Sequence, residues 1–308
     1  MTIDRASTFS LLPVDAATPL GFVGLGTMGA GMARRLRLGG FALTVYNRDL
    51  AKTEALRAAG ASVGTLQEVG RNAQVVLLCV SDTAASEAVL FGPDGLAGTL
   101  RPGACVIDCS TIAADGARRF AQRLAERGIA YLDAPVSGGQ QGAEAGTLSC
   151  MVGGDAEAFA LCQPIFACIA TRTVHMGPVG HGQVTKACNQ VAVAAAMLGV
   201  AESMALARRQ GVDATLVREV LLGGAAKSVA MERFAPRMIA GDHQPGFRAV
   251  LMRKDLRLAL ENGREGGSFM PVAALASQLL DVVVNQDRGD LDWSVLGALF
   301  AELSGAPH

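Results

Sequence analysis

Short apolar runs and amphipathic stretches alternate along the first 180 residues of the chain. Runs typical of strands end at residues 22–23 or occupy residues 43–46, 75–80, 105–108, 131–135, 148–153 and 173–176. Amphipathic segments at 50–59 and 113–127 predict helices between them. The wholly apolar run at 75–80 indicates a strand buried on both faces of a parallel sheet. This alternation predicts an α/β domain with a Rossmann-type, doubly wound parallel sheet.

The pattern becomes purely helical after residue 180. Residues 184–209 contain no proline and a single glycine, which predicts one long helix. Further segments with helical periodicity lie at 214–222, 229–240, 250–265, 271–286 and 294–303. We therefore expect an N-terminal extension over residues 1–19, a nucleotide-binding Rossmann domain over 20–180, and an all-α C-terminal domain for substrate binding and oligomerisation over 181–308.

Composition narrows the class of protein. The 308 residues are 50% hydrophobic and 18% charged, with a net charge of −1 and no basic stripe for nucleic acid. The chain has neither a run of eighteen apolar residues nor a polybasic segment, so the sequence predicts no contact with a membrane. The first nineteen residues lack an apolar core like that of a signal peptide, and the seven cysteines form no C-x-x-C pair. We expect a cytoplasmic protein without nucleic-acid or membrane partners.

A glycine-rich turn follows the first predicted strand and opens a helix. Gly24, Gly26 and Gly29 have the G-x-G-x-x-G spacing, in which one glycine makes a tight turn, one admits a pyrophosphate and one allows close helix–strand packing. The helix N-terminus behind the turn attracts anions. The spacing therefore predicts that a dinucleotide binds to the turn, which consists of Gly24, Leu25, Gly26, Thr27, Met28 and Gly29.

The residues after the second predicted strand indicate which dinucleotide is preferred. A carboxylate at this point favours NAD because it binds the ribose 2′-hydroxyl, whereas an arginine pairs with the 2′-phosphate of NADP. Here Asn47 and Arg48 come first, and Asp49 is the alternative ribose contact. We predict a preference for NADP over NAD.

Ligands of doubly wound sheets bind outside the carboxyl ends of the strands. The predicted strand ends carry small or polar residues at Val80-Ser81, at Ser110-Thr111 and at Ser137-Gly138-Gly139. Successive small residues expose backbone N–H groups that can hold a carboxylate, although a turn without a ligand has the same composition. We expect Val80 and Ser81 at the cofactor and the Ser137 loop at a small carboxylate-bearing substrate.

Lys186 is the most informative single residue. Only four of the 27 basic residues are lysines, and Lys186 lies in the first turns of the long helix among apolar neighbours. Gln183, Asn189 and Gln190 lie near it at helical spacing. Burying an ammonium group is costly, so this position suits a proton donor, with a salt-bridged structural lysine as the alternative. We expect no metal site, because His175 and His181 lack ligand partners at useful spacing.

Six motifs occur in one order along nearly the whole chain. They are Gly-Phe-Val-Gly-Leu-Gly-Thr-Met-Gly at 21–29, Asp-Cys-Ser-Thr at 108–111, Asp-Ala-Pro-Val-Ser-Gly-Gly at 133–139, Gly-Thr-Leu-Ser at 146–149, Gly-His-Gly-Gln-Val-Thr-Lys-Ala-Cys-Asn-Gln at 180–190 and Lys-Asp-Leu at 254–256. With these motifs the chain resembles the β-hydroxyacid dehydrogenase family, which is related to 6-phosphogluconate dehydrogenase. The resemblance implies that Lys186 is the general acid/base, that Ser137, Gly138 and Gly139 bind the substrate carboxylate, and that Thr111 and Lys254 lie near the nicotinamide.

Family members often carry asparagine four residues after the lysine, whereas this chain has Gln190 preceded by Asn189. Either residue could orient the substrate. The Lys-x-x-Asn-Gln form, with Asn47-Arg48, resembles the tartronate semialdehyde and glyoxylate reductase branch. We therefore predict an NADP-preferring reductase of such substrates.

Three alternatives stay open. One is oxidation of 3-hydroxyisobutyrate, threonate or a β-hydroxy amino acid, and imine reduction ranks lower because imine reductases usually lack the lysine. A cofactor-binding interaction module without catalysis is the third, and the intact Lys186 argues against it.

We also expect a homodimer or homotetramer, because the C-terminal domain is apolar and includes Trp293.

Overall fold

The computed structural model describes residues 13–305. The chain divides into two compact units, Met1–Lys186 and Ala187–His308. The boundary expected at residue 180 lies next to the start of helix α9 (His181–Arg209), which continues through the division. Most of the expected N-terminal extension lies outside the described residues. Its last part forms a turn in which Asp15 accepts the Thr18 N–H, and Val14 is buried against the first unit's core.

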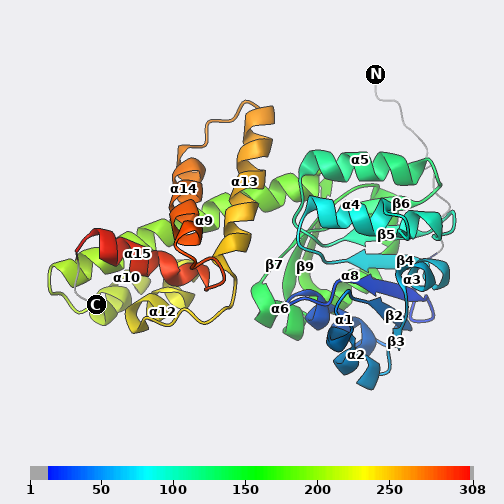
Figure 1. Cartoon of the computed structure of the whole chain (residues 1–308), viewed down its shortest axis with the longest axis horizontal. Coiled ribbons are helices and arrows are strands. Elements are labelled where there is room, and N and C mark those ends of the chain that lie inside the picture. Colours follow the sequence, from blue (N-terminus) through cyan, green and yellow to red (C-terminus); the bar gives the residue numbers. More distant parts are fainter. Residues whose placement is uncertain (1–12, 306–308) are drawn as a thin grey trace. The chain divides into compact units, whose positions relative to one another are not determined.

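The first unit is built on a nine-stranded, mostly parallel sheet (Figure 1). Its strands are β1 (Leu20–Val23), β2 (Leu43–Tyr46), β3 (Ser62–Val63), β4 (Val75–Leu78), β5 (Cys105–Asp108), β6 (Ala130–Asp133), β7 (Val136–Ser137), β8 (Leu148–Gly153) and β9 (Ala170–Gly177). The parallel strands follow the order β3-β2-β1-β4-β5-β6, and β8 pairs antiparallel with β6 and β7 but parallel with β9. This order confirms the predicted doubly wound sheet.

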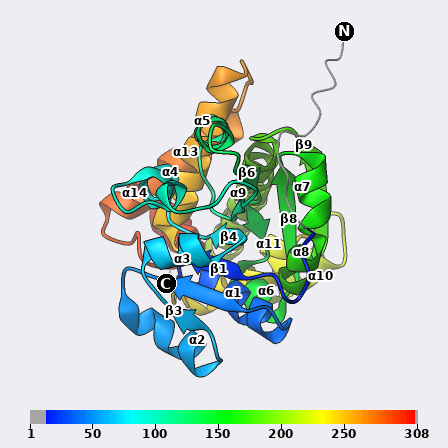
Figure 2. The same cartoon turned by 90° about the vertical axis from the view of Figure 1, so that its right-hand side faces the viewer.

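Helices cover both faces of the sheet because alternate strand residues point to opposite sides. Phe22, Leu77 and Ile107 pack in one cluster against α1 (Gly29–Leu38), α2 (Glu54–Ala58), α6 (Gly139–Ala145), α7 (Ala156–Leu161) and α8 (Gln163–Ile169). Val76 and Val106 pack in another against α3 (Leu66–Asn72), α4 (Thr83–Phe91) and α5 (Ala114–Ala125). Figure 2 shows the two sets on opposite sides of the sheet.

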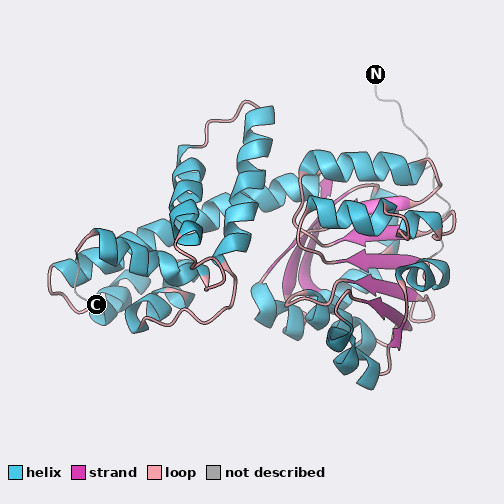
Figure 3. Ribbon diagram, viewed as in Figure 1, coloured by secondary structure: helices cyan, strands magenta, loops and turns pink. Residues whose placement is uncertain are grey.

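The described part of the second unit consists of helices and connecting loops without a strand, as predicted (Figure 3). After α9 follow α10 (Ala214–Leu222), α11 (Val229–Arg233), α12 (Ala235–Ala240), α13 (Ala249–Glu265), α14 (Pro271–Asn285) and α15 (Leu296–Leu303). The single helix expected over 229–240 is divided at Phe234, because Pro236 supplies no N–H to continue α11. Trp293 is buried in the core of this unit, edge-on to Phe234.

Helix α9 is long and apolar enough to cross a membrane by length and composition alone. Its mean hydropathy in the best window is 1.6, and half of that window is buried inside the protein. A core helix of a globular domain has the same properties, so this helix is weak evidence for a membrane span.

Candidate active site

The last residues of five parallel strands lie side by side at one edge of the sheet. The register pairs Tyr46 with Val23, Val23 with Leu78, Leu78 with Asp108, and Asp108 with Asp133. The strand order reverses between β1 and β4, where doubly wound folds bind their ligands. The structure therefore brings to this edge the loops that carry residues 24–29, Asn47, Arg48, Val80, Ser81 and Thr111.

Two of the three glycines of the turn are required by the fold, and the third, Gly26, is not. Gly24 has a φ of +96°, and a side chain there would strike the Cys79 carbonyl. A side chain on Gly29 would strike the Gly24 carbonyl in the same way. Gly26 has no positive φ, and a Cβ there would have no neighbour within 4 Å. The protein itself thus has no need of glycine at 26, and the open space suits a pyrophosphate that approaches the backbone.

Helix α1 begins at Gly29 directly behind this turn. Its first turn contains no acidic residue, and no side chain caps its N-terminus. A helix start of this kind leaves backbone N–H groups and partial positive charge for an anion. The turn and the helix therefore fit a dinucleotide.

Asn47 ties the end of β2 to the glycine turn. Its Oδ1 accepts the Leu25 N–H at 2.9 Å, and its Nδ2 donates to the Asp49 carbonyl at 2.9 Å. The Asp49 carboxylate accepts the Ala51 N–H at 3.1 Å and caps a 3₁₀ turn (Leu50–Thr53), which replaces the first half of the helix expected over 50–59. Asp49 thus already has a local role, whereas Arg48 is exposed.

Ser110 joins the loops that follow β4 and β5. Its Oγ accepts the Val80 N–H at 2.9 Å, and its own N–H donates to Asp108 Oδ1 at 2.9 Å. The Tyr131 hydroxyl donates to the other Asp108 oxygen at 3.2 Å. Burial raises the pKa of Asp108, while the hydrogen bonds from Ser110 and Tyr131 oppose that rise.

The Ser137-Gly138-Gly139 segment turns sharply from β7 into α6. Ser137 pairs with Ser149 of β8, and the φ angles of Gly138 and Gly139 are +138° and +68°. Residues with a side chain rarely adopt such φ angles, which explains why both positions are glycine. The space where Gly139 would carry a Cβ is open. A carboxylate in this loop remains a prediction.

Lys186 lies in the second turn of α9 and is only 7% exposed. The start of α9 is held by Asp133, the last residue of β6. One Asp133 oxygen accepts the Gly180 N–H at 2.8 Å, and the other accepts the Gln183 N–H at 2.9 Å. Burial raises the pKa of Asp133 to about 6, although these two hydrogen bonds favour the carboxylate. The helix that carries Lys186 is thereby fixed to the edge of the sheet.

The second unit holds the other predicted residues in one hydrogen-bonded cluster. The Asn189 amide donates to Gln190 Oε1 at 2.7 Å, and Gln190 Nε2 donates to Asp255 Oδ2 at 2.6 Å. Lys254 Nζ lies 3.1 Å from Asp255 Oδ1. Gln190 is 5% exposed and engaged at both ends of its amide, whereas Asn189 is partly exposed.

Sequence reasoning missed three buried carboxylates that organise these loops: Asp108, Asp133 and Asp255. Two of them offered a signal, because Asp108 and Asp133 each end an apolar run that predicts a buried strand. A charge at the end of such a run needs partners. Among residues 13–305, no group of three or more His, Cys, Asp or Glu side chains is placed to hold a metal ion.

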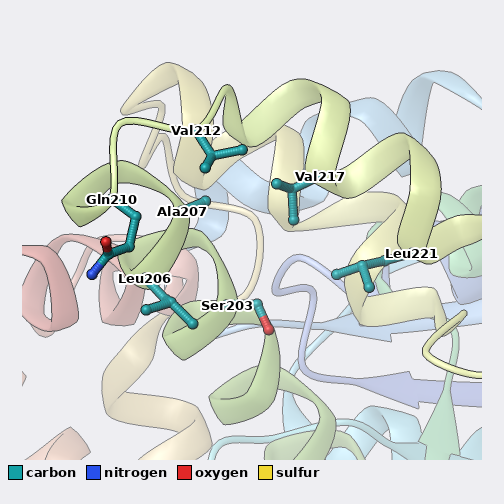
Figure 4. Close-up of a pocket in the computed structure, with 7 residues that line it drawn as sticks. All are labelled: Ser203, Leu206, Ala207, Gln210, Val212, Val217 and Leu221. Atoms are coloured by element: carbon teal, nitrogen blue, oxygen red, sulfur yellow. The ribbon is translucent and has the colours of Figure 1, made fainter.

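A separate groove lies wholly in the second unit. It has a volume of about 450 Å³ and runs between α9 and α10 (Figure 4). Its lining is largely apolar and consists of Ser203, Leu206, Ala207, Gln210, Val212, Val217 and Leu221. Lys186, the Ser137 loop, Asn189, Gln190 and the glycine turn do not line it.

Comparison with known proteins shows the family to which the chain belongs. Residues 19–177 match the model for the NAD binding domain of 6-phosphogluconate dehydrogenase, and residues 180–299 match that for the NAD-binding domain of NADP-dependent 3-hydroxyisobutyrate dehydrogenase. The NAD-dependent L-serine dehydrogenase of Pseudomonas aeruginosa is 38% identical over 93% of this chain and 99% of its own. The 2-hydroxy-3-oxopropionate reductase of Escherichia coli is 37% identical over 90% of this chain and 95% of its own. The crystal structure of 3-hydroxyisobutyrate dehydrogenase from Salmonella typhimurium superposes with a TM-score of 0.85 at 28% identity, covering 92% of this chain and 99% of that one.

Proposed function

Because the chain belongs to the β-hydroxyacid dehydrogenase family and is an oxidoreductase that uses a pyridine nucleotide, we propose that it reduces tartronate semialdehyde (2-hydroxy-3-oxopropionate) or glyoxylate with NADPH. The observation that carries the proposal is a buried lysine, Lys186, on a helix fixed to the sheet edge where the cofactor loops meet. The Lys-x-x-Asn-Gln sequence of that helix and the exposed Arg48 support this choice of substrate and cofactor.

In the proposed reduction, each of the predicted site residues would have a distinct role. The glycine turn would hold the pyrophosphate of NADPH, whose nicotinamide would supply a hydride for the carbonyl carbon of the substrate. Lys186 donates a proton to the carbonyl oxygen, which becomes the hydroxyl of the product. Ser137, Gly138 and Gly139 bind the substrate carboxylate and thereby orient the carbonyl, while Thr111 and Lys254 support the nicotinamide. In the reverse direction, neutral Lys186 takes the proton from the hydroxyl.

A substrate panel tests this assignment. We expect kcat/KM with NADPH to be at least tenfold higher for tartronate semialdehyde or glyoxylate than for methylmalonate semialdehyde, as measured by the absorbance of NADPH at saturating cofactor. A higher kcat/KM for oxidation of 3-hydroxyisobutyrate, threonate or L-serine would replace the proposal with the second candidate.

That second candidate is oxidation of a 3-hydroxyacid, in particular a β-hydroxy amino acid. The observation in its favour is the 38% identity to the L-serine dehydrogenase over 93% of this chain. An amino group on the substrate needs a hydrogen-bond acceptor or a carboxylate close to it. Activity with L-serine but not with D-glycerate would identify this function.

Arg48→Ala is expected to lower kcat/KM for NADPH by at least tenfold and to leave that for NADH within threefold. The reason is that a hydrogen bond to a charged group contributes roughly 1.5–3 kcal/mol, and only NADPH carries the 2′-phosphate. Steady-state kinetics with each cofactor measure the effect, with Arg57→Ala, an exposed arginine of α2, as the control. Equal losses with both cofactors would contradict an NADP-specific role.

We also propose that the protein is a homodimer or homotetramer that associates through the apolar groove of the second unit. Leu206 and Val212 line this groove and are 63% and 50% exposed, and Leu216 and Val220 of α10 are 59% and 75% exposed. An apolar patch of this kind commonly marks an interface. Trp293 plays no part in it, contrary to our expectation, because its side chain is buried.

Leu206→Glu is expected to shift the protein towards monomer, since a charge in an apolar interface is desolvated without a partner. Light scattering across a concentration series measures the mass. Leu38→Glu, at an equally exposed leucine of α1, is the control and should leave the mass unchanged. A wild-type protein that is monomeric at all concentrations would contradict the proposal.

We further infer a cytoplasmic location, because all seven cysteines are free thiols.

A further inference from the structure

We infer that Gln183 is a positioning residue, which holds the loop carrying Thr111 and the helix carrying Lys186 in one fixed arrangement. The inference rests on the proposed function, in which Thr111 lies at the nicotinamide and Lys186 donates the proton. It concerns a side chain to which sequence reasoning gave no role beyond sharing a helix face with the lysine.

The Gln183 carboxamide binds the backbone on both sides of Thr111. Its Nε2 donates to the Ser110 carbonyl at 2.9 Å, and its Oε1 accepts the Ile112 N–H at 3.1 Å. These two backbone groups flank Thr111, so the amide spans that residue like a clamp. Ser110 is in turn bonded to Val80 through its Oγ, which extends the connection to the loop after β4.

Gln183 itself has little freedom to move. It is 2% exposed, and its backbone N–H donates to Asp133 Oδ2 at 2.9 Å. The Asp133 carboxylate is tightly packed against two glycines, since a side chain added at Gly153 or Gly182 would collide with it. Buried hydrogen bonds satisfied at both ends rigidify their neighbourhood. The clamp is therefore attached to the sheet through Asp133 and to the loop through its own amide.

Lys186 follows Gln183 by three residues on the same helix. That spacing is close to one helical turn, so the two residues lie near each other on neighbouring turns. A shift of the first turn of α9 relative to the Thr111 loop is consequently a shift of the lysine relative to the nicotinamide site. Hydride and proton must reach adjacent atoms of one carbonyl group. A misplacement of about 1 Å can lower the rate by about 100-fold.

The test removes the clamp while keeping its volume. Gln183→Met is expected to lower kcat by about 10–100-fold and to change KM and the Kd of NADPH by less than threefold. Gln122→Met, at an exposed glutamine of α5, is the matched control and should keep wild-type kcat. Should Gln183→Met fail to fold, Gln183→Glu replaces it. This variant has the same shape and keeps an acceptor for Ile112, but it loses the donor to Ser110.

A double-mutant cycle with Lys186→Ala separates positioning from a general structural role. We expect the effect of the Gln183 substitution on kcat to be at least tenfold smaller in the Lys186→Ala background, since no lysine is left to misplace. The same loss in both backgrounds, or an unchanged kcat in Gln183→Met and Gln183→Glu, would overturn the inference while leaving the proposed function intact. A Lys186→Ala enzyme with normal kcat would instead refute the proposed function, and this inference with it.

Discussion

Lys186→Ala is expected to lower kcat for the reduction of tartronate semialdehyde by NADPH by about 10²–10⁴-fold. This range is typical for the loss of a positioned proton donor. Lys186 is 7% exposed, and its helix is held by two hydrogen bonds to Asp133, so the substitution removes the proton donor and leaves these helix contacts in place. The hydride source is untouched by the substitution, and the loss should therefore appear in kcat.

Two measurements show whether the loss is chemical. The Kd of NADPH, followed by its fluorescence, should stay within threefold of wild type, because the predicted contacts with the pyrophosphate and ribose lie at the glycine turn and Arg48. Lys52→Ala, at an exposed lysine, should have normal kcat. A Lys186→Ala enzyme with kcat within threefold of wild type would show that another group donates the proton.

Gly26→Val is expected to raise the Kd of NADPH by at least 100-fold without lowering the melting temperature. A Cβ at this residue would have no neighbour within 4 Å, and the φ is not positive, so we expect the protein alone to accommodate the larger side chain. A bound pyrophosphate would need the same space. Gly24→Ala should behave differently and destabilise the fold, because its added methyl group meets the Cys79 carbonyl at a φ of +96°.

Isothermal titration with NADPH and thermal unfolding measure the two effects separately. Gly98→Val is the matched control, because Gly98 also has open space and no positive φ but lies in a 3₁₀ turn away from the strand ends that carry the cofactor loops. It should bind NADPH with wild-type affinity. An unchanged affinity of Gly26→Val for NADPH would show that the pyrophosphate does not bind at the glycine turn.

Sequence periodicity predicted best the strands and helices whose apolar run or stripe has clear ends. The strands over 105–108 and 148–153 and the helix over 214–222 have the predicted limits, because apolar runs or stripes end there at polar or glycine residues. The strand expected over 75–80 ends at Leu78, since the chain turns where Val80 bonds to Ser110. Two-residue strands such as β3 and β7 are too short to produce a period, so the sequence gives no signal for them.

The sequence offers candidates where one short segment carries the chemistry. The spacing of the glycine turn predicts a nucleotide site, and the position of Lys186 on a long apolar helix indicates a candidate acid. The connections between segments were not predictable, because Asp133 and Gln183 bind groups 47 to 73 residues away along the chain. Such pairs follow from the order of the strands, which periodicity alone does not determine.

Transfer of deuterium tests the central claim most directly. The protein is mixed with tartronate semialdehyde and NADPH that carries deuterium at both C4 positions, and the glycerate formed is examined by mass spectrometry and NMR. The proposed reaction places one deuterium on C3 of each glycerate molecule, and Lys186→Ala should form this product at least 100-fold more slowly. The account would be contradicted by a protein that binds NADPH but forms neither deuterated glycerate from tartronate semialdehyde nor, in a parallel reaction, deuterated glycolate from glyoxylate.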